Sequence, residues 1–79
     1  SPLYFVAFDR DGLTVLHSRP EQIGRQATVQ GTPGEIEAVR AITASDEGQV
    51  TFTSGGVQQT IIYRTSPLTG WKYGIGIEG

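Results

Sequence analysis

Few side chains in this 79-residue sequence are of the types that carry out chemistry. His17 is the single histidine and cysteine is absent, so a metal site lacks a second imidazole or a thiolate. Asp9 and Asp11 stand in a D-x-D-G stretch without the later oxygen ligands of a calcium loop, which favours a turn. No nucleophile elbow is visible. We therefore expect no enzyme activity, no metal and no cofactor.

Four residues are candidates for binding a small ligand. His17 ends an apolar stretch and could donate a hydrogen bond to a carboxylate or respond to pH; a packing or surface role is the alternative. Arg64 could clamp a carboxylate bidentately, with Tyr63 adding a hydroxyl, although strand neighbours point to opposite faces. Arg19, and Arg25 after it, lie in a long polar loop and could border a pocket, or could be plain surface charges.

Composition indicates one small globular domain. Hydrophobic residues make up 37% and charged residues 18% of the chain, a balance typical of an ordered globule. The net charge is −2 and the basic residues are scattered, so we expect no nucleic-acid partner. No apolar run is long enough to span a membrane. Eleven glycines and four prolines imply many turns and short strands.

The order of apolar runs and turn residues predicts an α+β fold. The one credible helix covers 33–46, because Thr32 can cap it, Pro33 suits its first position and Glu35 completes a capping box. An irregular loop, with a short helical turn at most, precedes it at 18–31. The expected strands are 3–8, 13–17, 49–53, 57–65 and 71–77. Hairpin connections make the sheet antiparallel, five-stranded and packed against the helix on one face.

The last strand has one bulky face and one bare face. Alternation places Trp71, Tyr73, Ile75 and Ile77 on one side, and Lys72, Gly74 and Gly76 on the other. We expect the bulky side to enter the core, with Trp71 buried. The glycine side should lie beneath a helix or a ligand, since glycine inside a strand often marks a close approach.

The first strand is apolar on both faces. Tyr4, Val6 and Phe8 point one way, and Phe5 and Ala7 point the other. One helix covers one face, so the other needs a helix from elsewhere or a second chain. We expect a two-fold homodimer through this face or through a strand edge.

Three stretches in order resemble the Cache family of bacterial sensor domains, which have a PAS-like sandwich fold. They are YFVAFDRDG with a following His17, the Pro20–Gly24 loop element, and GWKYGIG at residues 70–76. The family's His-Pro pair is represented here by H-S-R-P at 17–20, which loosens the match in the loop. The resemblance spans most of the chain.

The resemblance implies a single sensor domain, residues 1–79, forming part of a larger receptor. It implies an extracytoplasmic, periplasmic position in an inner-membrane histidine kinase, chemoreceptor or diguanylate cyclase, with covalently linked membrane helices and a cytoplasmic output domain. The expected partner is a small carboxylate or amino acid, with His17, Arg19, Tyr63 and Arg64 as ligand-binding candidates. The alternatives are a non-binding relay or dimerisation module of the same architecture, and a cytoplasmic PAS-like regulatory domain.

Overall fold

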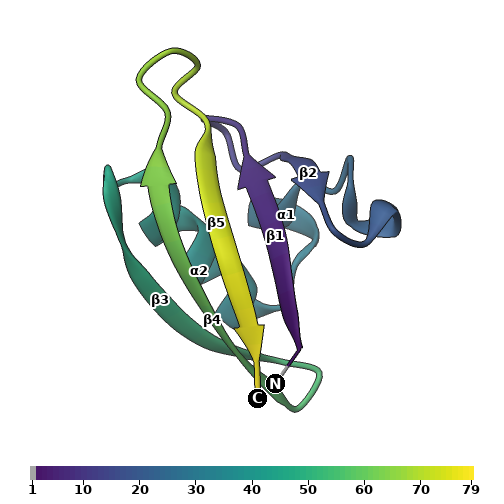
Figure 1. Cartoon of the computed structure of the whole chain (residues 1–79). Coiled ribbons are helices and arrows are strands. Elements are labelled where there is room, and N and C mark those ends of the chain that lie inside the picture. The colour runs from purple at the N-terminus through teal and green to yellow at the C-terminus, as the bar shows by residue number, and fades with distance from the viewer. Residues whose placement is uncertain (1) are drawn as a thin grey trace.

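A computed structural model describes residues 2–79. Five strands form one antiparallel sheet in the order β2-β1-β5-β4-β3, and the helices lie together behind it (Figure 1). The elements are β1 Leu3–Phe8, β2 Thr14–His17, η1 Pro20–Gln22, α1 Ala27–Gln30, α2 Pro33–Thr43, β3 Glu47–Ser54, β4 Val57–Thr65 and β5 Lys72–Glu78. This confirms the expected α+β, PAS-like fold with one main helix on one face.

The acidic D-x-D-G stretch forms the turn between β1 and β2. The Asp9 Oδ1 atom accepts hydrogen bonds from the backbone N–H groups of Asp11 and Leu13, both at 2.9 Å. Gly12 has φ +85°, a conformation that L side chains rarely adopt. An aspartate that folds back onto its own backbone is a turn former, as expected.

Helix α2 begins at the predicted cap and ends earlier than expected. The Thr32 Oγ1 atom accepts a hydrogen bond from the Glu35 N–H at 3.3 Å, and Pro33 occupies the first turn. The helix ends at Thr43 rather than at 46, because the chain turns at Ala44 and Ser45 and enters β3 at Glu47.

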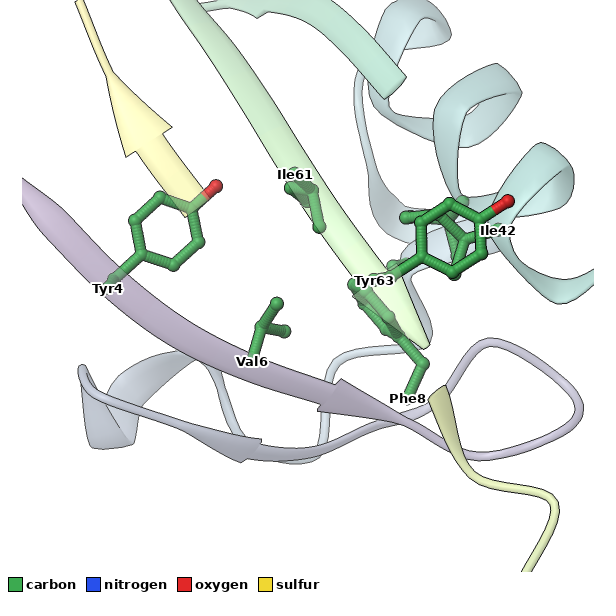
Figure 2. Packing of buried hydrophobic residues seen from close by; sticks show 8 residues of the cluster. Tyr4, Val6, Phe8, Ile42, Ile61 and Tyr63 are labelled. Carbon is green, nitrogen blue, oxygen red and sulfur yellow. The ribbon is translucent and has the colours of Figure 1, made fainter. Parts of the chain in front are cut away.

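The core lies between α2 and the inner face of the sheet (Figure 2). Val39 and Ile42 on α2 are fully buried and lie on the apolar stripe by which this helix packs against the sheet. The residues of the core cluster are Tyr4, Val6, Phe8, Ala27, Val39, Ile42, Ile61 and Tyr63.

The prediction for the two faces of β5 is wrong. Tyr73 and Ile75 are 42% and 49% exposed, whereas Lys72 is only 6% exposed and Gly76 is buried. Trp71 precedes the strand and is half-buried, so it is not a central core residue. The bare face of β5 is therefore the inner face, and the bulky face is the outer one.

The reason for this inversion is an aromatic ring from the neighbouring strand. Tyr4 pairs with Gly76 across β1 and β5, and a Cβ atom at Gly76 would overlap the Tyr4 ring. The glycine makes room for a tyrosine side chain, not for a helix or a ligand. At the other end of β5, the Lys72 Nζ donates to the Ser45 carbonyl at 2.9 Å and to Thr65 Oγ1 at 2.6 Å. The buried cation thus lies by the C-terminus of α2, where a positive charge is favourable.

The outer face of the sheet is apolar and uncovered within residues 2–79. Its exposed side chains include Phe5 at 51%, Ile62 at 48%, Tyr73 at 42% and Ile75 at 49%. Phe5 pairs with Ile75, which pairs in turn with Ile62, so these three form one row across β1, β5 and β4. Ala7 is only 1% exposed, so it forms the floor of this face and adds little to its surface.

Replacing Gly76 by Val should destabilise the fold by about 1–3 kcal/mol, because the added methyl groups collide with the Tyr4 ring inside a packed core. Urea denaturation monitored by circular dichroism measures the loss. Ile75→Val, on the exposed side of the same strand, is the control and should change the free energy of unfolding by less than about 0.5 kcal/mol. A Gly76→Val protein as stable as the parent would contradict the packing described here.

Candidate functional site

A polar cavity of about 330 Å³ opens on the helix side of the sheet. Its walls come from the inner faces of β1 and β4, from the end of β3, from the loop after β2 and from the first turn of α2. The lining residues are Tyr4, His17, Arg19, Gln22, Arg25, Gln30, Thr32, Glu35, Phe52, Ser54 and Gln59. The volume lies at the small end of the range for ligand sites and suits a metabolite of a few heavy atoms.

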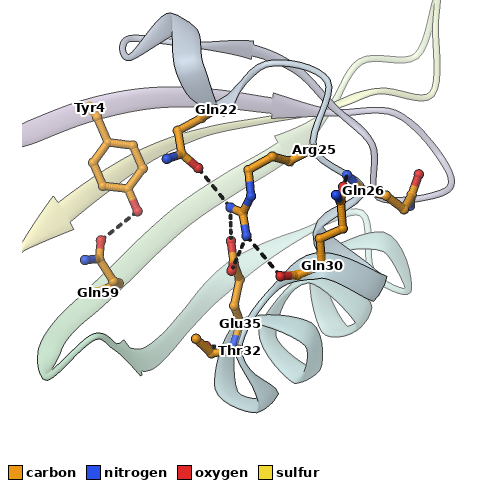
Figure 3. A network of polar contacts seen from close by, with 8 residues as sticks. All are labelled: Tyr4, Gln22, Arg25, Gln26, Gln30, Thr32, Glu35 and Gln59. Atoms are coloured by element: carbon orange, nitrogen blue, oxygen red, sulfur yellow. Dashed lines mark hydrogen bonds and ion pairs between the residues drawn. The ribbon is translucent and has the colours of Figure 1, made fainter.

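An arginine–glutamate pair forms one wall of the cavity. The Arg25 Nη1 donates to Glu35 Oε2 at 3.2 Å and to Gln22 Oε1 at 2.8 Å (Figure 3). The Arg25 Nη2 donates to Glu35 Oε1 at 3.4 Å and to the carbonyl of Gln30 at 3.3 Å. These contacts tie the loop to the start of α2 and hold the guanidinium in a fixed orientation.

A second polar chain crosses the sheet at the opposite wall. The Tyr4 hydroxyl donates to Gln59 Oε1 at 2.8 Å, and the Gln59 Nε2 donates to Glu78 Oε2 at 3.3 Å. The Glu78 carboxylate also forms an ion pair with Arg19, whose guanidinium carbon lies 5.5 Å from the centre of the Tyr4 ring. This polar chain therefore takes Tyr4 from β1, Gln59 from β4 and Glu78 from β5, and the loop after β2 adds Arg19.

His17 lines the cavity and stacks its ring on the ring of Tyr4. The two rings are stacked with centroids 5.0 Å apart and an interplanar angle of 13°. The Nδ1 atom of His17 accepts a hydrogen bond from the Arg19 backbone N–H at 2.9 Å, which places the proton of the neutral ring on Nε2. Burial, and then the Arg19 charge, lower the pKa of His17 below 6.5, so the ring is neutral at pH 7.

Protonation states around the cavity follow from the same contacts. Burial, and then the Glu78 charge, raise the pKa of Tyr4 to about 12, so its hydroxyl remains a donor. The hydrogen bond from Arg19, and then that from Gln59, lower the pKa of Glu78 below 4.5 and keep it ionised. Each cation in the cavity thus faces a carboxylate. The arrangement can bind a polar group of either charge, but it has no activated nucleophile.

The four ligand-binding candidates do not meet at one place. His17 and Arg19 line the polar cavity, and so does Arg25 from the same loop. Tyr63 is buried in the core at 5% exposure. The Arg64 side chain is 78% exposed on the opposite face of the sheet, 3.4 Å from Glu47.

Several cavity residues were not among the sequence-derived candidates. Among the lining residues, the sequence predicts Glu35 only as part of the capping box, and Gln22 and Gln59 carry no motif at all. Glu78, which accepts a hydrogen bond from Gln59, carries none either. Gln59 is the most informative, because it is a polar side chain only 9% exposed on a β-branched strand. A glutamine at an inward position of such a strand was the available signal, since buried amides need partners.

Within residues 2–79, no group of three or more His, Cys, Asp or Glu side chains is arranged to hold a metal ion. Nor does any helix there combine the length and apolar character required to cross a bilayer.

Comparison with known proteins shows a similarity of fold to a solved structure. No protein-family model matches the chain, and no curated protein does. Among solved structures, it is similar to an extracellular ligand binding receptor from Desulfohalobium retbaense DSM5692, with a TM-score of 0.63 and 20% sequence identity. The match covers 95% of this chain and 12% of the receptor chain. The two proteins therefore share a domain fold, and this chain corresponds to a small part of the receptor's length.

Acidification should destabilise the protein through His17. Its pKa in the folded state lies below 6.5, so the unfolded chain takes up a proton more readily as the pH falls through 6.5. Protonation would also put an N–H on Nδ1 against the Arg19 N–H. The melting temperature should fall as the pH is lowered from 7 to 5.5. Glu78 remains ionised at these pH values, because its pKa lies below 4.5.

The His17→Gln variant isolates this effect, since glutamine does not titrate. Differential scanning fluorimetry of both proteins from pH 7 to 5.5 should give a steeper decline for the parent. Parallel curves would show that His17 does not control this part of the pH profile.

Proposed function

We propose that this domain is the extracytoplasmic sensing part of a bacterial membrane receptor and that it binds a small metabolite in the polar cavity. The ligand class we propose is a zwitterion, an amino acid, in preference to a simple organic acid. The receptor class (histidine kinase, chemoreceptor or diguanylate cyclase) is part of the proposal, as are the linked membrane helices and the output domain. A binding role, not a catalytic one, is proposed throughout.

The observation that carries the proposal is the charge pairing in the cavity wall. Arg25 is already engaged by Glu35, so a lone carboxylate would separate the pair and leave Glu35 without its cation. A zwitterion supplies a carboxylate for the guanidinium and an ammonium for the glutamate, which preserves both charges' partners. The fold shared with a domain of an extracellular ligand binding receptor supports the sensing role and the position outside the cytoplasm.

A thermal-shift screen against the standard amino acids and small carboxylates tests the proposal. A ligand present at 100 times its dissociation constant adds about 2.7 kcal/mol to the free energy of unfolding, which produces a clear shift. Arg25→Gln should abolish the shift, because it removes the guanidinium from the cavity wall.

Arg64→Gln is the matched control, since that arginine lies on the outer face and should leave ligand binding unchanged. A parent protein whose melting temperature responds to no compound in the screen would count against a binding role. Loss of the shift in Arg64→Gln but not in Arg25→Gln would place the ligand on the outer face of the sheet and contradict binding in the cavity.

A relay or dimerisation module remains the second candidate, favoured by the uncovered outer face. The row of Phe5, Ile75 and Ile62 exposes large apolar side chains of a kind that monomers rarely leave open as a patch. In this alternative the cavity is structural, and the outer face joins two copies related by a two-fold axis.

We expect this domain to self-associate through the outer face at high concentration. Phe5→Glu should shift it to monomer, because the charge would be desolvated in the interface. Sedimentation velocity over a dilution series measures the effect. Leu68→Glu is the control, since Leu68 is 93% exposed in the β4–β5 turn and should not change the association. A parent that stays monomeric at every concentration would contradict this expectation.

A further inference from the structure

The environment of the Arg19 side chain has the composition of a cation-binding site. It consists of an aromatic ring, Tyr4, and a carboxylate, Glu78, which is held in place by the amide of Gln59. A guanidinium over a tyrosine ring gains from the ring quadrupole, and a carboxylate beside it adds an ionic hydrogen bond. These are the groups by which proteins recognise free organic cations.

Tyr4, Gln59 and the Glu78 carboxylate, the anionic half of this site, are held in place by contacts that do not involve Arg19. The Tyr4 hydroxyl holds Gln59 at 2.8 Å, and Gln59 holds Glu78 at 3.3 Å. Their strands lie in the middle of the sheet, where β5 pairs with β1 on one side and with β4 on the other. The Glu78 side chain is 17% exposed and Tyr4 is 8% exposed, so this half is sheltered as well as braced.

The cationic half is attached loosely by comparison. The Arg19 side chain is 46% exposed, and within residues 2–79 its side-chain hydrogen bond goes to Glu78 alone. The backbone of Arg19 is held separately, by its N–H to His17 and its carbonyl to Gln22. The guanidinium can therefore swing away without unfolding the loop.

We propose that Tyr4, Gln59 and Glu78 form a subsite for a guanidinium compound and that Arg19 occupies it as a tethered competitor. A free alkylguanidinium would take the place of the Arg19 head group on Glu78 and over Tyr4. The subsite adjoins the polar cavity, because Tyr4, Arg19 and Gln59 also line that cavity. The inference deepens the proposed sensing function and rests on it for its biological meaning, since a ligand there would extend into the same cavity.

The contacts of the Arg19 side chain determine how strongly it competes with a free guanidinium for the subsite. An exposed ion pair and a cation–π contact together hold a side chain by an amount equivalent to a factor of about three to thirty in an equilibrium constant. Removing the tethered guanidinium should therefore tighten binding of a free one by about that factor, because the subsite no longer has to be vacated.

The test is an NMR titration of the parent and Arg19→Gln with ethylguanidinium, following the backbone amides of Glu78 and Gly79. Arg19→Gln should bind it about three to thirty times more tightly than the parent. N-ethylurea, a neutral molecule of the same shape, should shift neither spectrum. Glu78→Gln introduced into Arg19→Gln should remove the binding, while Arg40→Gln, on the exposed side of α2, should behave as the parent.

Equal affinity in the parent and Arg19→Gln, no binding in Arg19→Gln, or retained binding without Glu78 would each overturn the subsite. If Arg19→Gln loses the dispersed amide spectrum of a folded protein, Arg19→Lys replaces it. Lysine lacks the planar guanidinium, so ethylguanidinium should still bind more tightly than to the parent, and no gain would overturn the proposal. Ethylguanidinium has no carboxylate, so its binding does not depend on Arg25. A negative result in the amino-acid screen would therefore count against the proposed function without deciding the outcome of this titration.

Discussion

The placement of the Tyr4 ring above Gly76 is the contact on which the rest of this structure depends. The glycine leaves space on the inner face of β5, and the tyrosine of the paired strand fills it. From that position the ring completes the core cluster, stacks on His17 and sends its hydroxyl to Gln59. The packing of the sheet and the wall of the cavity are therefore set by one side chain, and a residue with a Cβ at position 76 would disturb both.

The elements of the fold were predictable because their signals are local. The Thr32 cap, the folded-back Asp9 and the runs of β-branched residues each act within a few positions, and the structure has them where expected. Alternation along β5 also separated two faces correctly. It could not say which face is inner, because that depends on Tyr4, more than seventy positions away along the chain from Gly76. The size of the side chains predicted the wrong inner face, since the large side chains of β5 lie on the outer face.

The candidate site was predictable only where it lies on the loop. His17 was named from its type and its position at a strand end, and Arg19 from its type and its position in the loop; both line the cavity. Their partners Gln59 and Glu78 come from strands that approach only in the folded sheet, so no spacing in the sequence joins them to the loop. Charge-bearing residues are easy to find in a sequence, but their pairing is a tertiary property, and the proposed preference for a zwitterion rests on that pairing.

The two faces of the sheet are not independent, because consecutive residues of the same strands supply them. Tyr4 lies against the polar cavity and Phe5 begins the outer apolar row, while Gly76 and Ile75 play the corresponding parts on β5. Period-two alternation means that a strand cannot shift its register by one residue without exchanging cavity residues for surface ones. A sensing role in the cavity and a dimerisation role on the outer face therefore rest on the same pairing of β1 with β5. Ligand binding in the cavity and self-association through the outer face are compatible, since each uses the side of that pair which the other leaves free.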